Sequence, residues 1–221
     1  MATKDDKTIW EWGPRVATRG LKDLYRPQKV QRFTVPPAGI DNLALSSKDT
    51  FLVPGQGEVE AEFEGFFRVA RAKPTSQDWA KAAVYVNVAN LFLRGRSDQL
   101  GEITVRRNPD RVSPGQTFGP GAAQAAAKCR IATSALFSVQ GLDGMTLFNK
   151  EPILLMNDGI DAIPPVEDPN GEAYIYRLPL YDQAKPDGRP VAYLTGLRYT
   201  VGNYVTTQEA TRFRKQERAA R

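Results

Sequence analysis

The most regular set of reactive side chains in this sequence is a run of glutamates that alternate with apolar residues: Glu58, Glu60, Glu62 and Glu64. In a β-strand, this period of two places all four carboxylates on one face. Carboxylates can bind a cation or act as acid and base. However, alternate residues of a strand lie about 6.6–7 Å apart, whereas calcium needs oxygens about 2.3–2.6 Å from the ion. The spacing therefore favours a solvated face with arginine partners on neighbouring strands. The candidate partners are Arg94, Arg96, Arg106 and Arg107.

Two residue types that carry much enzyme chemistry are absent or nearly absent. The chain has no histidine and one cysteine, Cys129. This excludes Ser-His-Asp and Cys-His catalysis, histidine-ligated zinc and any four-cysteine site. Cys129 follows an alanine-rich stretch and precedes an expected strand, where an unpaired thiol usually serves as a small buried hydrophobe. We therefore favour a non-enzymatic role, and we predict no cofactor.

The best candidate for metal binding is an acidic turn region between residues 157 and 172. Loops can converge oxygen ligands in a way that a strand cannot, which makes calcium the cation to consider. The weak candidate ligands are Asp158, Asp161 and Asp168. The region does not match an EF-hand loop, and its Asp-Gly and Asn-Gly pairs are equally typical of turns with positive φ.

Charge is distributed unevenly along the chain, whose net charge is +5. Residues 1–35 carry eight basic and four acidic side chains, and residues 207–221 carry five and two, so the remaining body has a net charge of −2. We expect residues 1–31 to form a basic arm and residues 207–221 a basic C-terminal helix or tail, with Thr206 and Glu209 as a capping box. Trp10 and Trp12 in the first arm gain from burial against a partner surface, since each ring can bury about 150–250 Å².

These arms are the predicted partner-binding elements. The residues proposed to make contact are Trp10, Trp12, Arg15, Arg212, Phe213 and Arg214. The expected partner is a second copy of this chain, giving a homo-oligomer, or another protein. Nucleic acid is less favoured, because acidic residues dilute the basic ones in the N-terminal arm.

Residues 32–206 are expected to form a single all-β domain. Alternating runs at 58–64, 84–93, 131–139 and 191–201 predict strands, and proline and glycine turns close shorter ones at 32–35 and about 50–53. In the second run, Val84, Val86, Val88 and Phe92 are expected to share one face. Residues 108–121, rich in proline and glycine, are expected to be the longest irregular segment. In the run from Tyr174 to Leu180, Pro179 predicts an edge strand. Eight to ten strands with regular turns predict an antiparallel β-sandwich, jelly-roll-like or immunoglobulin-like.

Two short segments carry a family resemblance: VPPAGIDNL at residues 35–43 and TFLVPGQG at residues 50–57. They resemble the opening of an uncharacterised family of bacterial β-rich domains of unknown function. The resemblance extends over about residues 32–205, implies a β-rich fold and supplies no catalytic residues.

Three functions remain open at this point. The first is a structural or protein-interaction sandwich that self-associates or docks through its arms. The second is a histidine-free enzyme or small-ligand carrier with a polar pocket, built from side chains such as Glu102, Asp161 and Tyr193. The third is a polyanion-binding coat or packaging protein. The hydrophilic start, the absence of a long apolar run and the single cysteine predict a cytoplasmic protein with no membrane contact.

Overall fold

The computed structural model describes residues 37–119, 127–160, 170–174, 177–204, 211 and 215. The expected strand at residues 32–35, the N-terminal arm and nearly all of the expected C-terminal helix lie outside the described residues. No helix among the described residues is long and apolar enough to cross a membrane.

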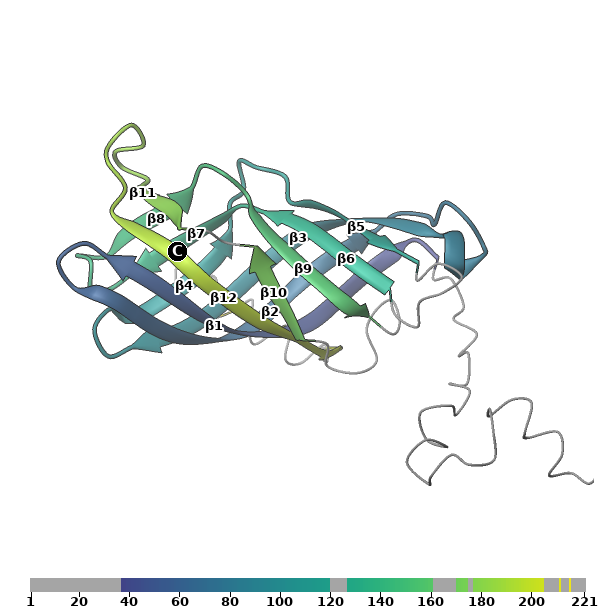
Figure 1. Cartoon of the computed structure of the whole chain (residues 1–221), viewed down its shortest axis with the longest axis horizontal. Helices are drawn as coiled ribbons and strands as arrows, with labels where there is room; N and C mark the ends of the chain where they lie inside the picture. The colour runs from purple at the N-terminus through teal and green to yellow at the C-terminus, as the bar shows by residue number, and fades with distance from the viewer. Residues whose placement is uncertain are drawn as a thin grey trace, which may run out of the picture. The chain divides into compact units, whose positions relative to one another are not determined.

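The predicted antiparallel all-β fold is confirmed. In the described residues, twelve strands join into one antiparallel sheet that folds back on itself to give two layers (Figure 1). The strands are β1 (Gly39–Val53), β2 (Gly57–Arg71), β3 (Ala83–Ser97), β4 (Gly101–Arg107), β5 (Pro114–Phe118), β6 (Ala127–Thr133), β7 (Ala135–Val139), β8 (Met145–Asn149), β9 (Ile153–Ile160), β10 (Asn170–Tyr174), β11 (Leu178–Asp182) and β12 (Ala192–Tyr204). A short 3-10 helix, η1 (Trp79–Lys81), precedes β3.

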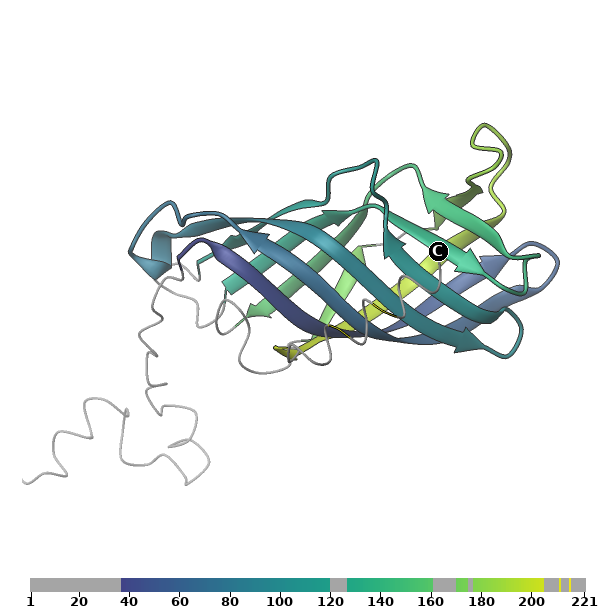
Figure 2. The same cartoon turned by 180° about the vertical axis from the view of Figure 1, so that it is seen from behind.

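The sheet closes in two places, because β1 pairs with β12 and β3 pairs with both β4 and β5. Four long strands, β1, β2, β3 and β12, therefore belong to two closed rings. We call the ring completed by β4, β7, β8 and β11 the packed ring. We call the ring completed by β5, β6, β9 and β10 the cavity ring. Figure 1 shows the two groups of short strands toward opposite ends of the long ones, and Figure 2 shows β1, β2 and β3 from behind.

Tight turns connect the strands where the sequence predicts them. Gln56 N donates to the carbonyl of Val53 at 3.0 Å, and Gly55 takes a φ of 86°, as a proline–glycine turn of type II requires. Asp143 and Gly144 both have positive φ in the loop of residues 140–144 between β7 and β8, where Met145 N donates to the carbonyl of Leu142 at 2.9 Å.

Two bulges change which side chains face the interior. Arg68 pairs with Asn90 and Val69 pairs with Val88, so Ala89 is an extra residue in β3. As a result, Val84, Val86 and Val88 share the interior with Leu91 and Leu93. The expected grouping of Phe92 with the valines is therefore wrong, because a bulge moves every later residue to the opposite face. Thr195 is the corresponding extra residue in β12.

Three other expectations are corrected by the pairing. β1 extends over Gly39–Val53, whereas the sequence pattern predicted a strand at residues 50–53 alone. β5 lies inside residues 108–121, which were expected to be irregular. β11, which contains Pro179, pairs with both β8 and β12 and is not an edge strand.

A chain of hydrogen bonds holds the seam where the short strands separate into two groups. The run expected as one strand at 131–139 breaks at Ser134, between β6 and β7. Buried Asn149 accepts a bond from Ala135 N at 2.8 Å and donates to the carbonyl of Thr133 at 3.2 Å, so it spans the break. Ser134 N donates to Ser113 Oγ at 3.3 Å, and the Ser113 carbonyl accepts from Val88 N. The seam therefore satisfies polar groups that the sheet leaves without strand partners.

The packed ring is filled by large side chains. Phe51 makes edge contacts with Phe63 and Phe137, with ring centroids 6.4 and 6.0 Å apart. Ile103 and Leu194 lie in the same buried cluster and are fully inaccessible. An eight-stranded closed sheet is just wide enough for its interior to be filled by side chains in this way.

Gly65 tests how closely β2 and β3 approach. A Cβ at this position would overlap the carbonyl oxygen of Phe92 and lie 2.9 Å from Cα of Leu93, both backbone atoms that cannot rotate away. We expect Gly65→Ala to lower the free energy of unfolding by at least about 2 kcal/mol in urea denaturation. The matched control is Gly196→Ala, whose Cβ would contact the Thr50 side chain at 3.3 Å. Its cost should stay below about 1 kcal/mol, and equal effects would contradict the packing argument.

Candidate functional site

The cavity ring holds a partly open cavity of about 110 Å³. Side chains from β1, β2 and β3 line one side, and side chains from β5, β6, β9 and β12 line the other. Val105 of β4 and Ala135 and Phe137 of β7 also belong to the lining, where the cavity meets the packed ring. Most of them are valine, leucine, isoleucine or phenylalanine, for example Val88, Leu93, Ile131 and Leu155. Closed eight-stranded sheets either fill their interior or hold one small ligand. Within this fold, the packed ring does the first and the cavity ring has room for the second.

An arginine–aspartate pair lines the cavity near the start of β1. Arg71 Nε lies 2.5 Å from Asp41 Oδ2, and Arg71 Nη2 donates to Asp41 Oδ1 at 3.1 Å. Arg71 also donates to the carbonyl of Pro37 at 2.9 Å. Both side chains are buried, so the two parallel hydrogen bonds neutralise charges that burial alone would destabilise.

A second acidic group, Asp49, lies eight residues further along β1, where the cavity meets the packed ring. Its side chain is 2% exposed, and its Oδ1 has no hydrogen-bond partner among the described residues. Burial raises the pKa of Asp49 from 3.8 to about 7, and the neighbouring Ser47 hydroxyl opposes part of that rise. Ser47 Oγ forms no well-aligned hydrogen bond within the described part of the chain, and neither does Thr133 Oγ1 on the opposite layer.

Cys129 of β6 and Thr117 of β5 form a third polar group on the cavity wall. The Cys129 sulfur accepts a hydrogen bond from Thr117 Oγ1 at 3.4 Å. Burial raises the pKa of this thiol, while Thr117 and Arg130 act in the opposite direction. Burial also raises the pKa of Tyr199. The thiol is therefore held in its neutral form, which agrees with the expected role of a small apolar side chain rather than a nucleophile.

The structure gives no support to a metal site in the region that it describes. Asp158 Oδ1 lies 2.6 Å from Arg130 Nη1, and the hydrogen bond to this guanidinium lowers the pKa of Asp158. Asp161 and Asp168 lie outside the described residues. In the described part of the chain, no three acidic, histidine or cysteine side chains converge in a way that could hold a metal ion.

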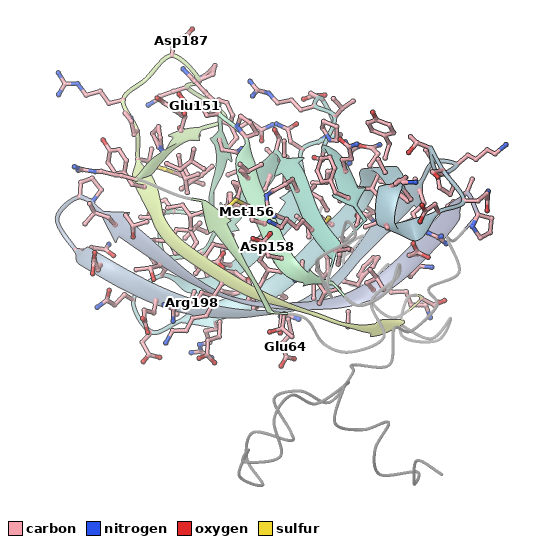
Figure 3. The ribbon with its side chains drawn as sticks, turned by 45° about the vertical axis from the view of Figure 1, so that its right-hand side comes forward. Glu64, Glu151, Met156, Asp158, Asp187 and Arg198 are labelled. Atoms are coloured by element: carbon pink, nitrogen blue, oxygen red, sulfur yellow. The ribbon has the colours of Figure 1, made fainter. Side chains whose placement is uncertain are left out.

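The glutamate run of β2 lies on the outer face, as predicted. The four side chains are exposed and alternate with buried Val59, Ala61 and Phe63. Glu62 and Glu64 lie opposite Arg96 and Arg94 in the sheet register, and Figure 3 shows Glu64 projecting away from the sheet. Ion pairs on this face include Lys48–Glu60 and Arg94–Glu102, both with N–O distances of 2.7 Å.

The polar pocket expected from the sequence is placed differently in the structure. The Glu102 side chain is 45% exposed, on the outer face. Tyr193 stacks under the Arg177 guanidinium and does not line the cavity, because the Thr195 bulge turns it outward. Asp161 lies outside the described residues, and so do Trp10, Trp12, Arg15, Arg212, Phe213 and Arg214.

Sequence reasoning missed Asp41, Asp49 and Arg71. In β1 the buried positions alternate, so Asp41 and Asp49 share an interior face with Leu43, Leu45 and Phe51. These aspartates interrupt the apolar pattern, which made most of β1 unrecognisable as a strand. Extending the strand backward from residues 50–53 with period two would have placed both carboxylates in the interior.

The buried state of Asp49 can be tested through stability. Between pH 3.8 and about 7 the folded chain holds this proton more tightly than the unfolded chain does. The resulting stabilisation is fully present below pH 3.8 and is lost as pH rises through about 7. Relative to Asp49→Asn, the wild type should therefore lose free energy of unfolding between these values, by at most about 4 kcal/mol. Urea titrations at several pH values measure this difference, and a pH-independent difference would contradict it.

Comparison with known proteins places the chain in a family. A solved structure, DynF from the dynemicin biosynthesis pathway of Micromonospora chersina, shares 44% sequence identity and a TM-score of 0.75. The match covers 80% of this chain and 85% of DynF. None of the curated proteins matches this sequence significantly. A family model matches residues 1–211, nearly the whole sequence. The chain therefore belongs to DUF6073, a family of unknown function, as its resemblance to an uncharacterised β-rich family indicated.

Proposed function

We propose that this protein binds a slender, largely apolar small molecule inside the cavity ring. The observation that carries the proposal is the cavity of about 110 Å³, walled mostly by aliphatic side chains, in a fold whose other ring is occupied by a cluster of aromatic side chains. An internal space of this size can accept a small apolar ligand, since apolar cavities of comparable volume are known to take up apolar molecules. The role is that of a carrier or binding protein.

The ionisable side chains on the described cavity wall support binding more than catalysis. Asp41 and Arg71 form an ion pair with two hydrogen bonds. Cys129 and Tyr199 are shifted toward their neutral forms by burial. The pKa of Asp49 is set by burial and by the Ser47 hydroxyl, with no contribution from a basic side chain of the described residues. The similarity to DynF, a protein of a biosynthetic pathway, agrees with a small-molecule ligand.

Binding can be tested by calorimetry with methyl heptyl ether, a neutral and slender probe. We expect saturable binding to the wild type. Val88→Phe should weaken it at least about tenfold, because Val88 is buried on the cavity wall and the added ring occupies the ligand volume. The matched control is Val112→Phe, the same exchange at a side chain that is 75% exposed. Absence of binding to the wild type up to the solubility limit would overturn the proposal.

Self-association through the terminal arms is a second candidate function. One observation favours a segment that covers the outer face. A row of apolar side chains lies on this face, opposite the cavity-lining residues, and crosses from β2 to β7 in register with Arg106. The row consists of Phe66, Phe92 and Leu136. Their exposed fractions are 0%, 1% and 8%, although they are not part of the interior cluster. We call these three side chains the outer apolar row. We propose that a terminal arm of this chain covers it, in a cytoplasmic protein that uses its arms for docking.

Light scattering and an apolar dye test this second candidate. The full chain and two deletions, of residues 1–31 and of residues 207–221, are compared at two salt concentrations. Loss of the covering arm should change the solution mass or expose the outer apolar row and raise dye fluorescence. Unchanged mass and fluorescence in both deletions would contradict arm docking.

Nucleic acid remains the less favoured partner, because the outer face of β2 carries four carboxylates. Binding of nucleic acid to this protein that weakens steeply as the salt concentration rises would reverse that preference.

A further inference from the structure

The inner end of the cavity carries polar atoms that the fold itself leaves unpaired. Asp49, Ser47 and Thr133 are 2%, 9% and 3% exposed, and all three line the cavity. Within the described residues, Asp49 Oδ1, Ser47 Oγ and Thr133 Oγ1 have no well-aligned hydrogen-bond partner, although the Ser47 hydroxyl lies close enough to Asp49 to lower its pKa. Most buried polar side-chain atoms in proteins are hydrogen-bonded, so a group of three unpaired atoms around one cavity calls for an explanation.

Packing alone gives Asp49 no reason to be acidic. Its neighbours on the interior face include Phe51, and it lies opposite Ala61 and Leu197 in the sheet register. An unpaired carboxyl in such surroundings destabilises the fold relative to an aliphatic side chain of similar size. The same unpaired atoms become favourable when a bound molecule supplies the missing hydrogen bonds.

The arrangement also determines which group can supply them. Ser47 and Asp49 are alternate residues on the same face of β1, so a carboxyl acceptor and a hydroxyl donor lie side by side. A ligand hydroxyl can donate to Asp49 Oδ1 and accept from Ser47 Oγ without carrying a charge, whereas an ammonium group would form a buried ion pair in a cavity walled mostly by aliphatic side chains. A ligand carboxylate would bring a charge to an end of the cavity where no basic side chain contributes to the pKa of Asp49, and it is disfavoured.

The cavity wall sets the shape of the remainder of the ligand. Asp41 and Asp49, eight residues apart on β1, both line the cavity, which corresponds to about 26 Å of extended strand. A cavity of such small volume, with lining residues spread over that length, must have a narrow cross-section. A narrow aliphatic wall fits an unbranched chain better than a fused ring system.

Resting on the ligand-binding function proposed above, we infer that the cavity binds an unbranched apolar alcohol, whose hydroxyl group pairs with Asp49 and Ser47 at the end of the cavity next to the packed ring. Asp49 is then a specificity-determining residue that discriminates a hydroxyl from other end groups. The Asp41–Arg71 pair, which is satisfied internally, lines another part of the wall.

Two constitutional isomers test the inference, because octanol donates a hydrogen bond and methyl heptyl ether does not. The measured quantity is the ratio of the two dissociation constants, determined by calorimetry for the full chain and for Asp49→Leu. We expect this substitution to weaken octanol relative to the ether by at least about fivefold, the size of one net hydrogen bond. Affinity for the ether should be retained. The matched control is Asp187→Leu, because Asp187 lies in the exposed loop between β11 and β12 (Figure 3).

The outcomes separate the inference from the function on which it rests. Ether binding with an unchanged ratio in Asp49→Leu would overturn the hydroxyl site and leave the ligand-binding function intact. Absence of binding by either isomer to the wild type would overturn both. Ser47→Ala is the second variant if Asp49→Leu does not fold, and it should shift the ratio in the same direction. A fold-change equal to that of Asp187→Leu would overturn the assignment.

Discussion

The structure depends on four long strands that serve two closed rings at once. β1, β2, β3 and β12 run through both rings, and each group of four short strands closes on them separately. β1 keeps one face inward through both rings, with Asp41 to Asp49 at the cavity and Phe51 in the packed ring. In β3 and β12, the bulges at Ala89 and Thr195 shift the alternation of inward side chains near the level where one ring gives way to the other.

The chemistry of the cavity follows from this division. Phe51 belongs to the aromatic cluster of the packed ring, and Asp49, two residues earlier on the same face, lies at the cavity. A carboxyl at that junction is shielded from water on the packed side and faces the cavity on the other, so its pKa rises. Asp41 experiences comparable burial but has Arg71 as a bidentate partner. Two aspartates of one strand thus take different roles because one has a fixed partner and the other does not.

The sequence allowed the fold class to be predicted, and the reasons for its failures are physical. The alternation of Glu58–Glu64 with apolar residues placed β2 correctly, because one face meets solvent and the other meets the core. The same logic failed for β1, where Asp41, Ser47 and Asp49 face the interior. It failed for Phe92 and Tyr193 because a single extra residue reverses the faces, and a local pattern does not show where that residue falls. Ring closure and the cavity depend on pairings between distant strands, such as β1 with β12, that no local signal encodes.

The seam at Ser113, Ser134 and Asn149 has a consequence for motion. The two groups of short strands meet there through a small number of side-chain hydrogen bonds rather than through continuous strand ladders. The seam is therefore the place where local separation of the two groups would break no strand ladder between them. A molecule held in the cavity could then exchange without global unfolding of the chain.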